Sequence, residues 1–206
     1  MTSSRFIYVI TDGTACDAKF ESYSRRIIGQ AVTAASTGAT HFQIREKQLS
    51  ASRLFELVND VVGAVAGSEL KILVNERVDV AIAVGADGVH LTSRSISAAD
   101  VREFFGGKLL IAVSTHDIVE VLRAQEQGAD LAVFGPVFDT PGKTAAGIVK
   151  LREACEKATG FPVIALGGID VSNARSAIET GAAGVAGIRY FSTAENIAKI
   201  AEELRQ

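Results

Sequence analysis

Eight short apolar segments rich in β-branched residues recur along this chain of 206 residues, and they constrain its fold more than any other feature. They span residues 5–11, 40–45, 70–75, 88–91, 109–113, 131–134, 162–166 and 184–188. Most are apolar along their whole length, as expected of parallel strands buried on both faces. Amphipathic stretches such as 50–65 lie between them. The alternation, about one unit per 26 residues, predicts an α/β fold: one (β/α)8 TIM-barrel domain over residues 1–206.

A recurring phrase supports this interpretation: Gly38-Ala39-Thr40, Gly85-Ala86-Asp87, Gly128-Ala129-Asp130 and Gly181-Ala182-Ala183. Each glycine is expected to end a helix in the left-handed conformation, so that the chain turns directly into the next strand. Helices are expected to begin after Ser50, after Ser97, and after Ser192 or Thr193. The alternative architecture, an open doubly wound sheet, would favour a glycine-rich fingerprint after the first strand, and residues 11–14 (Thr-Asp-Gly-Thr) are not one.

Charge and composition exclude several classes of protein. The 21 Lys and Arg against 24 Asp and Glu give a net charge of −3, which argues against nucleic-acid and membrane-surface partners. Two cysteines are too few for a disulfide scaffold or a zinc site, and Cys155 is expected to be a buried thiol. The apolar run 6–10 is too short for a signal peptide or a membrane span, so a cytoplasmic location is expected. No sequence feature points to a particular oligomeric state.

Polar and glycine residues gather just after the apolar segments, where a barrel of this kind carries its active site. Gly167-Gly168 and Gly187-Ile188 follow the last two segments, and their backbone N–H groups can bind a phosphate. The alternative is that these glycines only form tight turns, but Arg189 beside them adds positive charge. Arg45 and Lys47 alternate along the second segment and so point the same way. With Lys143 from another loop they predict a diphosphate site, whereas a solvated surface pair is the alternative.

Three histidines complete the set of candidate residues. His116 follows a strand beside Ser114 and Thr115 and could act as a general acid or base, or its ring could form only local hydrogen bonds. His90 is expected to be a satisfied interior residue, and His41 is a weaker candidate. No cluster of His, Cys and carboxylates shows metal-ligand spacing.

Motifs spread over the whole chain resemble one known family, the thiamine phosphate synthase/TenI superfamily. They occur in order: Gln43-Ile44-Arg45-Glu46-Lys47, Asn75-Glu76-Arg77-Val78-Asp79, Ala86-Asp87-Gly88-Val89-His90-Leu91, Val113-Ser114-Thr115-His116, Gly135-Pro136-Val137-Phe138, Thr140-Pro141-Gly142-Lys143 and Ala165-Leu166-Gly167-Gly168-Ile169. Each motif alone is weak, but the ordered set is specific.

The resemblance implies an enzyme that joins hydroxymethylpyrimidine diphosphate to thiazole phosphate and releases diphosphate, with Mg²⁺ and enzyme cations stabilising the departing charge. It implies contacts to diphosphate and pyrimidine from Gln43, Arg45, Lys47, Asn75, Ser114 and Lys143. It implies contacts to the thiazole phosphate from Thr140, Gly168 and Ile188, beside Arg189. Arg45, Lys47, Ser114 and Lys143 are thus the expected catalytic residues, joined by His116 chiefly if the protein is a tautomerase.

Departures from the family pattern leave a second enzyme open. Glu76 replaces one of two Asp ligands for Mg²⁺, and the other position is occupied by Ser95, a poor ligand for a hard cation. Arg189 replaces a Ser, and Gly142 a Thr. TenI-type proteins lack metal ligands and include thiazole tautomerases, which move a proton without a metal. The cations Arg45, Lys47 and Lys143 nevertheless favour the synthase. A non-catalytic protein that binds a thiamine precursor for regulation is a third hypothesis.

Overall fold

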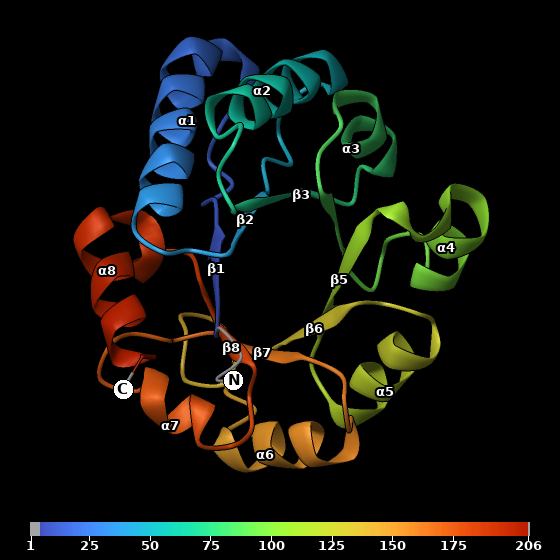
Figure 1. Ribbon diagram of the computed structural model, residues 1–206, viewed down its shortest axis with the longest axis vertical. Helices are drawn as coiled ribbons and strands as arrows, with labels where there is room; N and C mark the ends of the chain where they lie inside the picture. Colours follow the sequence, from blue (N-terminus) through green and yellow to red (C-terminus); the bar gives the residue numbers. More distant parts are fainter. Residues whose placement is uncertain (1–4, 206) are drawn as a thin grey trace.

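Eight parallel strands close into a barrel in the computed structural model, which describes residues 5–205 (Figure 1). They pair in chain order, and β8 returns to β1. The strands are β1 (Phe6–Ile10), β2 (His41–Ile44), β3 (Lys71–Asn75), β4 (Gly88–Leu91), β5 (Leu110–Thr115), β6 (Leu131–Phe134), β7 (Val163–Leu166) and β8 (Gly184–Gly187). The predicted (β/α)8 architecture is confirmed. One domain over residues 1–206 stays a prediction, since residues 1–4 and 206 lie outside the described range.

Helices follow the strands and form a ring around the barrel (Figure 1). They are α1 (Phe20–Ser36), α2 (Ala51–Ala64), α3 (Val78–Val84), α4 (Ala98–Phe105), α5 (Ile118–Glu126), α6 (Ile148–Lys157), α7 (Ala174–Ile178) and α8 (Ala194–Glu203), with 3-10 turns η1 (Asp17–Lys19), η2 (Gly106–Lys108) and η3 (Tyr190–Ser192). The predicted caps at Ser50, Ser97 and Thr193 are confirmed, because each side chain accepts a backbone N–H of the first helical turn.

Strand alternation divides the buried residues into two clusters. The larger one packs between the strands and the helices. The smaller one belongs to the inward-facing positions of the barrel and contains Tyr8, Ile10, Leu73, Ala112, Leu131, Val133, Ile164 and Ala186. The next inward positions of β2, β3 and β4 hold the buried polar residues Gln43, Asn75 and His90. In β3 the inward positions therefore change from apolar Leu73 to polar Asn75 toward the carboxyl end, whereas in β2 both His41 and Gln43 are buried polar residues.

The recurring glycine phrases tie the amino-terminal ends of the strands together. Gly38, Gly85, Gly128 and Gly181 all have a positive φ, as predicted. In three of the four phrases the side chain of the third residue accepts a hydrogen bond from a neighbouring strand, a role that the sequence did not reveal. Backbone N–H groups of Ile7, Ile72 and Ile111 donate to the side chains of Thr40, Asp87 and Asp130, respectively, at 3.1, 2.8 and 2.7 Å.

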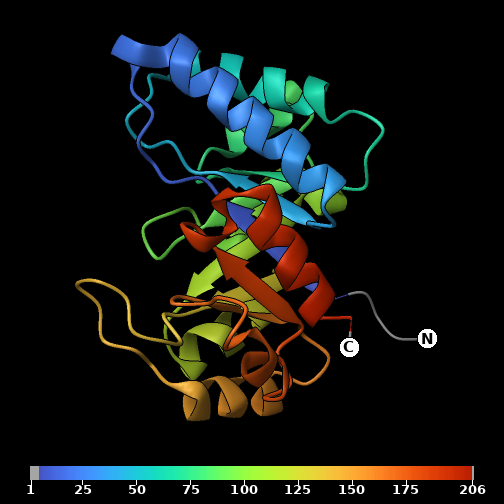
Figure 2. The same ribbon diagram turned by 90° about the vertical axis from the view of Figure 1, so that its left-hand side faces the viewer.

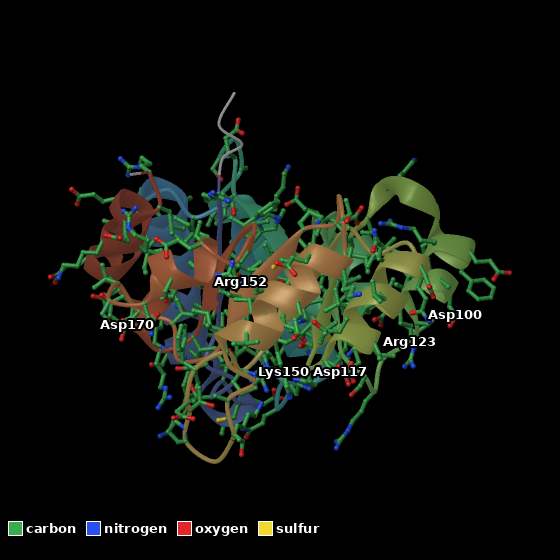
Figure 3. The ribbon with its side chains drawn as sticks, turned by 90° about the horizontal axis from the view of Figure 1, so that it is seen from below. Asp100, Asp117, Arg123, Lys150, Arg152 and Asp170 are labelled. Carbon is green, nitrogen blue, oxygen red and sulfur yellow. The ribbon has the colours of Figure 1, made fainter. Side chains whose placement is uncertain are left out.

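One loop is longer than those beside it. The connection between β6 and α6 projects well beyond its neighbours (Figure 2), and in Figure 3 it extends past Lys150 at the start of α6.

Cys155 on α6 is only half-buried, but burial still raises the pKa of its thiol. Among residues 5–205, no helix combines the length and the apolar character needed to cross a bilayer.

Candidate active site

A cavity of about 640 Å³ opens at the carboxyl ends of the strands. It is lined by every residue predicted to be catalytic or to bind substrate: Gln43, Arg45, Lys47, Asn75, Ser114, His116, Thr140, Lys143, Gly168, Ile188 and Arg189. Arg45 and Lys47 lie beyond β2, which ends at Ile44, so their shared direction comes from the loop and not from strand alternation. The barrel thus brings together residues that are spread over most of the sequence.

The floor of the cavity presents one buried acceptor without a partner. The Gln43 side-chain amide donates from Nε2 to Oδ1 of Asn75 at 3.0 Å. Asn75 in turn donates from Nδ2 to the Glu76 carboxylate at 3.1 Å. Among the described residues, Oε1 of Gln43 accepts no hydrogen bond. Because a buried acceptor without a partner is costly, this oxygen is suited to an N–H donor on a bound molecule.

A buried chain of hydrogen bonds supports Ser114 from behind. The Tyr8 hydroxyl lies 2.8 Å from Nδ1 of His90, and Nε2 of His90 lies 2.7 Å from the Ser114 hydroxyl. Burial lowers the pKa of His90 to about 3 and raises that of Tyr8 well above its usual value, so both are neutral near pH 7. If Tyr8 donates to Nδ1, His90 donates from Nε2 to Ser114, and every buried hydrogen is used. The Ser114 hydroxyl is then free to donate into the cavity.

His90 was expected to be a satisfied interior residue, and this is confirmed, since it is 2% exposed and both ring nitrogens have partners. It also lines the cavity, a role that sequence reasoning missed. Tyr8 was missed altogether. The available signal was a phenol at an inward position of an otherwise apolar strand, where its hydroxyl needs a partner.

Positive charge is concentrated on the cavity wall. Lys47 lies 3.2 Å from Glu76. Arg45, Lys143 and Arg189 form no ion pair with any carboxylate among residues 5–205. Lys143 enters from the long loop after β6, where its backbone N–H donates to the carbonyl of Thr140 at 3.1 Å. Cations that face one cavity without neutralising partners favour the binding of a multiply charged anion.

Glu76, the predicted metal ligand, lies beside this cavity and not in its lining. Its Oε1 accepts from Thr92 and Ser95, and its Oε2 from Asn75 and Lys47. Partial burial works to raise the pKa of Glu76, but the hydrogen bonds from Thr92 and Lys47 outweigh it and lower the pKa below its usual value. All four acceptor positions of the carboxylate are therefore in use.

This donor set fits Mg²⁺ only as a partial site. No group of three or more His, Cys, Asp or Glu side chains that could hold a metal occurs in the part of the chain that the structure describes. Ser95 closes a turn on Thr92 and donates to Glu76 at 3.3 Å. Mg²⁺ is commonly held by one carboxylate together with substrate phosphates. Glu76 can supply that carboxylate by releasing Lys47.

The predicted phosphate site follows β7 and β8. Gly167 and Gly168 have φ values of 100° and 66°. A Cβ on Gly168 would lie 2.7 Å from Cβ of Phe138, and one on Gly187 would lie 2.0 Å from the Phe191 ring. Close packing therefore requires these glycines, as the turn hypothesis holds. The turns also line the cavity beside Arg189, so phosphate binding there stays a compatible prediction.

The ring of His116 contacts a residue that is distant in sequence. Its Nδ1 lies 2.5 Å from the carbonyl oxygen of Gly135 at the end of β6, so Nδ1 carries the proton and donates. The expected alternative, a hydrogen bond within its own helix start, applies only to its backbone N–H, which donates to Glu120 at 2.6 Å. With Nδ1 engaged in this way, Nε2 is the ring nitrogen left for a bound molecule, on a residue that lines the cavity.

Comparison with known proteins shows the family of the chain. A relative in Geobacter sulfurreducens is 40% identical over 184 residues, which cover 87% of this chain and 83% of that protein. The thiamine-phosphate synthase of Chloroflexus aurantiacus is 34% identical over 203 residues, covering 97% and 90%. The solved thiamine phosphate pyrophosphorylase of Pyrococcus furiosus superposes with a TM-score of 0.81 at 33% identity, covering 98% and 94%. The family profile described as thiamine monophosphate synthase matches residues 7–191, and the chain therefore belongs to the thiamine monophosphate synthase/TenI family.

Proposed function

We propose that this protein is a thiamine phosphate synthase, which couples hydroxymethylpyrimidine diphosphate to thiazole phosphate and releases diphosphate. The observation that carries the proposal is the set of cations Arg45, Lys47 and Lys143 in one cavity with the glycine turns after β7 and β8. Lys47 has only the Glu76 carboxylate as a partner, and Arg45 and Lys143 form no ion pair among residues 5–205, so a single phosphate held by the turns after β7 and β8 would leave these two cations without a counter-charge. Relatives that carry this enzyme's name match between 81% and 97% of the chain.

The residues suit a dissociative substitution. The C–O bond between the pyrimidine methylene and the diphosphate breaks, and its electron pair leaves with the diphosphate. The lone pair of the thiazole nitrogen then forms the new C–N bond. Arg45, Lys47 and Lys143 would stabilise the leaving group as its charge develops. Oε1 of Gln43 would accept from an amino group on the pyrimidine, and the Ser114 hydroxyl would donate to an acceptor of the same substrate.

The second substrate would occupy the side of the cavity formed by the last two strands. Thr140, Gly168 and the backbone at Ile188 would hold the thiazole phosphate, and Arg189 would add charge to this site. Glu76 would hold Mg²⁺, which when bound neutralises diphosphate charge. Closure of the site against water would protect the pyrimidine cation from hydrolysis.

The direct test is to mix the purified protein with both precursors and Mg²⁺ and to measure thiamine phosphate and diphosphate. We expect equal amounts of the two products. Absence of thiamine phosphate under conditions in which both precursors bind would contradict the proposal. If neither precursor is converted in any way, the protein is a non-catalytic binding protein. The cytoplasmic location and the lack of nucleic-acid and membrane partners stay predictions.

One observation favours a second candidate, a thiazole tautomerase. Nε2 of His116 is a free acceptor at the cavity, and its orientation is set by the hydrogen bond from Nδ1 to Gly135. A base held in this way could take a proton from one position of a thiazole and return it to another. The replacement of an acidic ligand by Ser95 is consistent with that metal-free reaction.

A further inference from the structure

Glu46 is a buried carboxylate located between two of the cavity's cations in the sequence. It is 3% exposed, while its neighbours Arg45 and Lys47 line the cavity. Glu46 itself is not in that lining. It forms no ion pair among residues 5–205. A buried carboxylate is costly unless its oxygens are satisfied, so its partners reveal its role.

Those partners are backbone groups of the loop between β1 and η1. Oε1 of Glu46 accepts from the N–H of Gly13 at 3.2 Å, and Oε2 accepts from the N–H of Ala15 at 2.8 Å. The loop is held from its other side by Arg26, which donates to Asp12 at 2.9 and 3.0 Å. Glu46 therefore fixes this loop against the start of the connection that follows β2.

The same loop forms the support for Arg45. The backbone N–H of Arg45 donates to Oγ1 of Thr11 at 2.8 Å. A Cβ added to Gly13 would lie 3.0 Å from Nη1 of Arg45 and 3.3 Å from its carbonyl oxygen. The Gly13 backbone thus lies directly against both the guanidinium and the main chain of Arg45, and a shift of the loop would release them.

We propose that Glu46 is a positioning residue for the diphosphate site, acting through the loop 11–15 on Arg45. The inference rests on the proposed function, because it assumes that Arg45 receives the diphosphate. Two N–H donors need two acceptor oxygens, and a carboxylate provides them whereas an amide provides one. The negative charge of Glu46 also offsets the repulsion between Arg45 and Lys47 before the diphosphate arrives.

The test is Glu46→Gln, which keeps the shape of the side chain and leaves one N–H without an acceptor. A misplaced Arg45 should raise the KM for the pyrimidine diphosphate about tenfold, and should weaken binding of inorganic diphosphate in Mg²⁺ buffer by the same factor. The KM for the thiazole phosphate should not change, because its site lies after β7 and β8. Steady-state kinetics and titration calorimetry give these values.

The matched control is Asp87→Asn. The Asp87 carboxylate also accepts a backbone N–H, that of Ile72 at 2.8 Å, but it precedes β4 at the end of the barrel away from the cavity. We expect this variant to lose stability while both KM values stay unchanged. A merely structural role for Glu46 would produce the same pattern in Glu46→Gln and would overturn the inference.

A second pair of variants covers the case in which Glu46→Gln does not fold. Thr11→Val removes the acceptor for the Arg45 N–H and should weaken diphosphate binding. Thr11→Ser keeps the acceptor and should bind diphosphate as tightly as wild type. Equal diphosphate affinity in both Thr11 variants would overturn the inference alone. If wild-type protein does not bind diphosphate in Mg²⁺ buffer, the proposed function fails and the inference fails with it.

Discussion

At the scale of single residues, Lys143 and His116 separate the two candidate reactions. In a synthase, Lys143→Ala removes a cation whose benefit grows as diphosphate leaves, so it should lower kcat more than it raises KM. The expected loss is about 10²–10³ in rate, or ~3–4 kcal/mol. His116→Ala should cost less, because the coupling needs no strong base there. The rates of thiamine phosphate formation by wild type, Lys143→Ala and His116→Ala check this prediction.

In a tautomerase the order reverses. Loss of the His116 base should cost about 10²–10⁴ in thiazole isomerisation, and Lys143→Ala should be nearly silent. Both reactions should therefore be measured on wild type and on each variant. An isomerase activity that disappears in His116→Ala, in a protein that makes no thiamine phosphate, would reverse our choice of function.

Glu76 is the residue proposed to hold Mg²⁺. Because its oxygens already accept from Thr92, Ser95, Asn75 and Lys47, Mg²⁺ should bind appreciably only together with diphosphate. Titration calorimetry should show little heat for Mg²⁺ with the empty protein and clear binding once diphosphate is present. Glu76→Gln should weaken that second binding. Tight binding of Mg²⁺ to the empty protein would show that another ligand exists.

At the scale of elements, the turn between β7 and α7 belongs to the site proposed for the second substrate. Gly168→Ala places a Cβ 2.7 Å from Cβ of Phe138 and 2.9 Å from the Asp139 carbonyl oxygen. The turn must then open, which should raise the KM for the thiazole phosphate and leave diphosphate affinity unchanged. Kinetics with each substrate varied in turn distinguish the two effects.

Gly160→Ala is the control for backbone strain. Gly160 also has a positive φ, 75°, but a Cβ there would meet nothing within 4 Å. Its cost should be limited to stability, at about 1–2 kcal/mol, because alanine is strained in this left-handed conformation. If both variants changed the thiazole KM equally, the effect would come from general destabilisation and not from the turn at Gly168.

At the scale of the whole molecule, the barrel interior holds two neutral histidines that should make stability depend on pH. Burial lowers the pKa of His90 to about 3 and that of His41 to about 4. The unfolded chain takes up protons near pH 6.5, while the folded chain does not. Stability is therefore full above pH 6.5 and is lost as the pH falls below it, by up to about 1.4 kcal/mol per pH unit for each histidine.

Urea unfolding at pH 7.5 and at pH 5 measures this loss. His41→Leu should make the loss smaller, since one of the two titrating groups is gone. Nε2 of His41 has no hydrogen-bond partner among the described residues, so the only hydrogen bond that the substitution removes is the one between Nδ1 and Thr40. It also removes the ring contacts with Phe6 and Tyr8, a loss that lowers stability equally at both pH values. An equal loss of stability in wild type and His41→Leu would show that other groups cause the acid sensitivity.

Sequence by itself determined the barrel, its glycine turns and part of the cavity lining, but not His90. These follow from local information: uninterrupted apolar runs mark strands covered on both faces, and the residue after each run must lie at the carboxyl end of a strand. The ordered motifs then indicated the family. Glu46 is part of the first of these motifs, but the motif does not show that its side chain is buried or that its carboxylate accepts from backbone N–H groups.

Only the tertiary structure decided which side chains meet inside the barrel. Tyr8 and His90 are 82 positions apart in sequence, and their strands β1 and β4 are not neighbours in the sheet. Their hydrogen bond exists because closure of the barrel brings inward positions of non-adjacent strands together across its interior. Local periodicity specifies which way a side chain points, but its partner is set by the curvature and register of all eight strands.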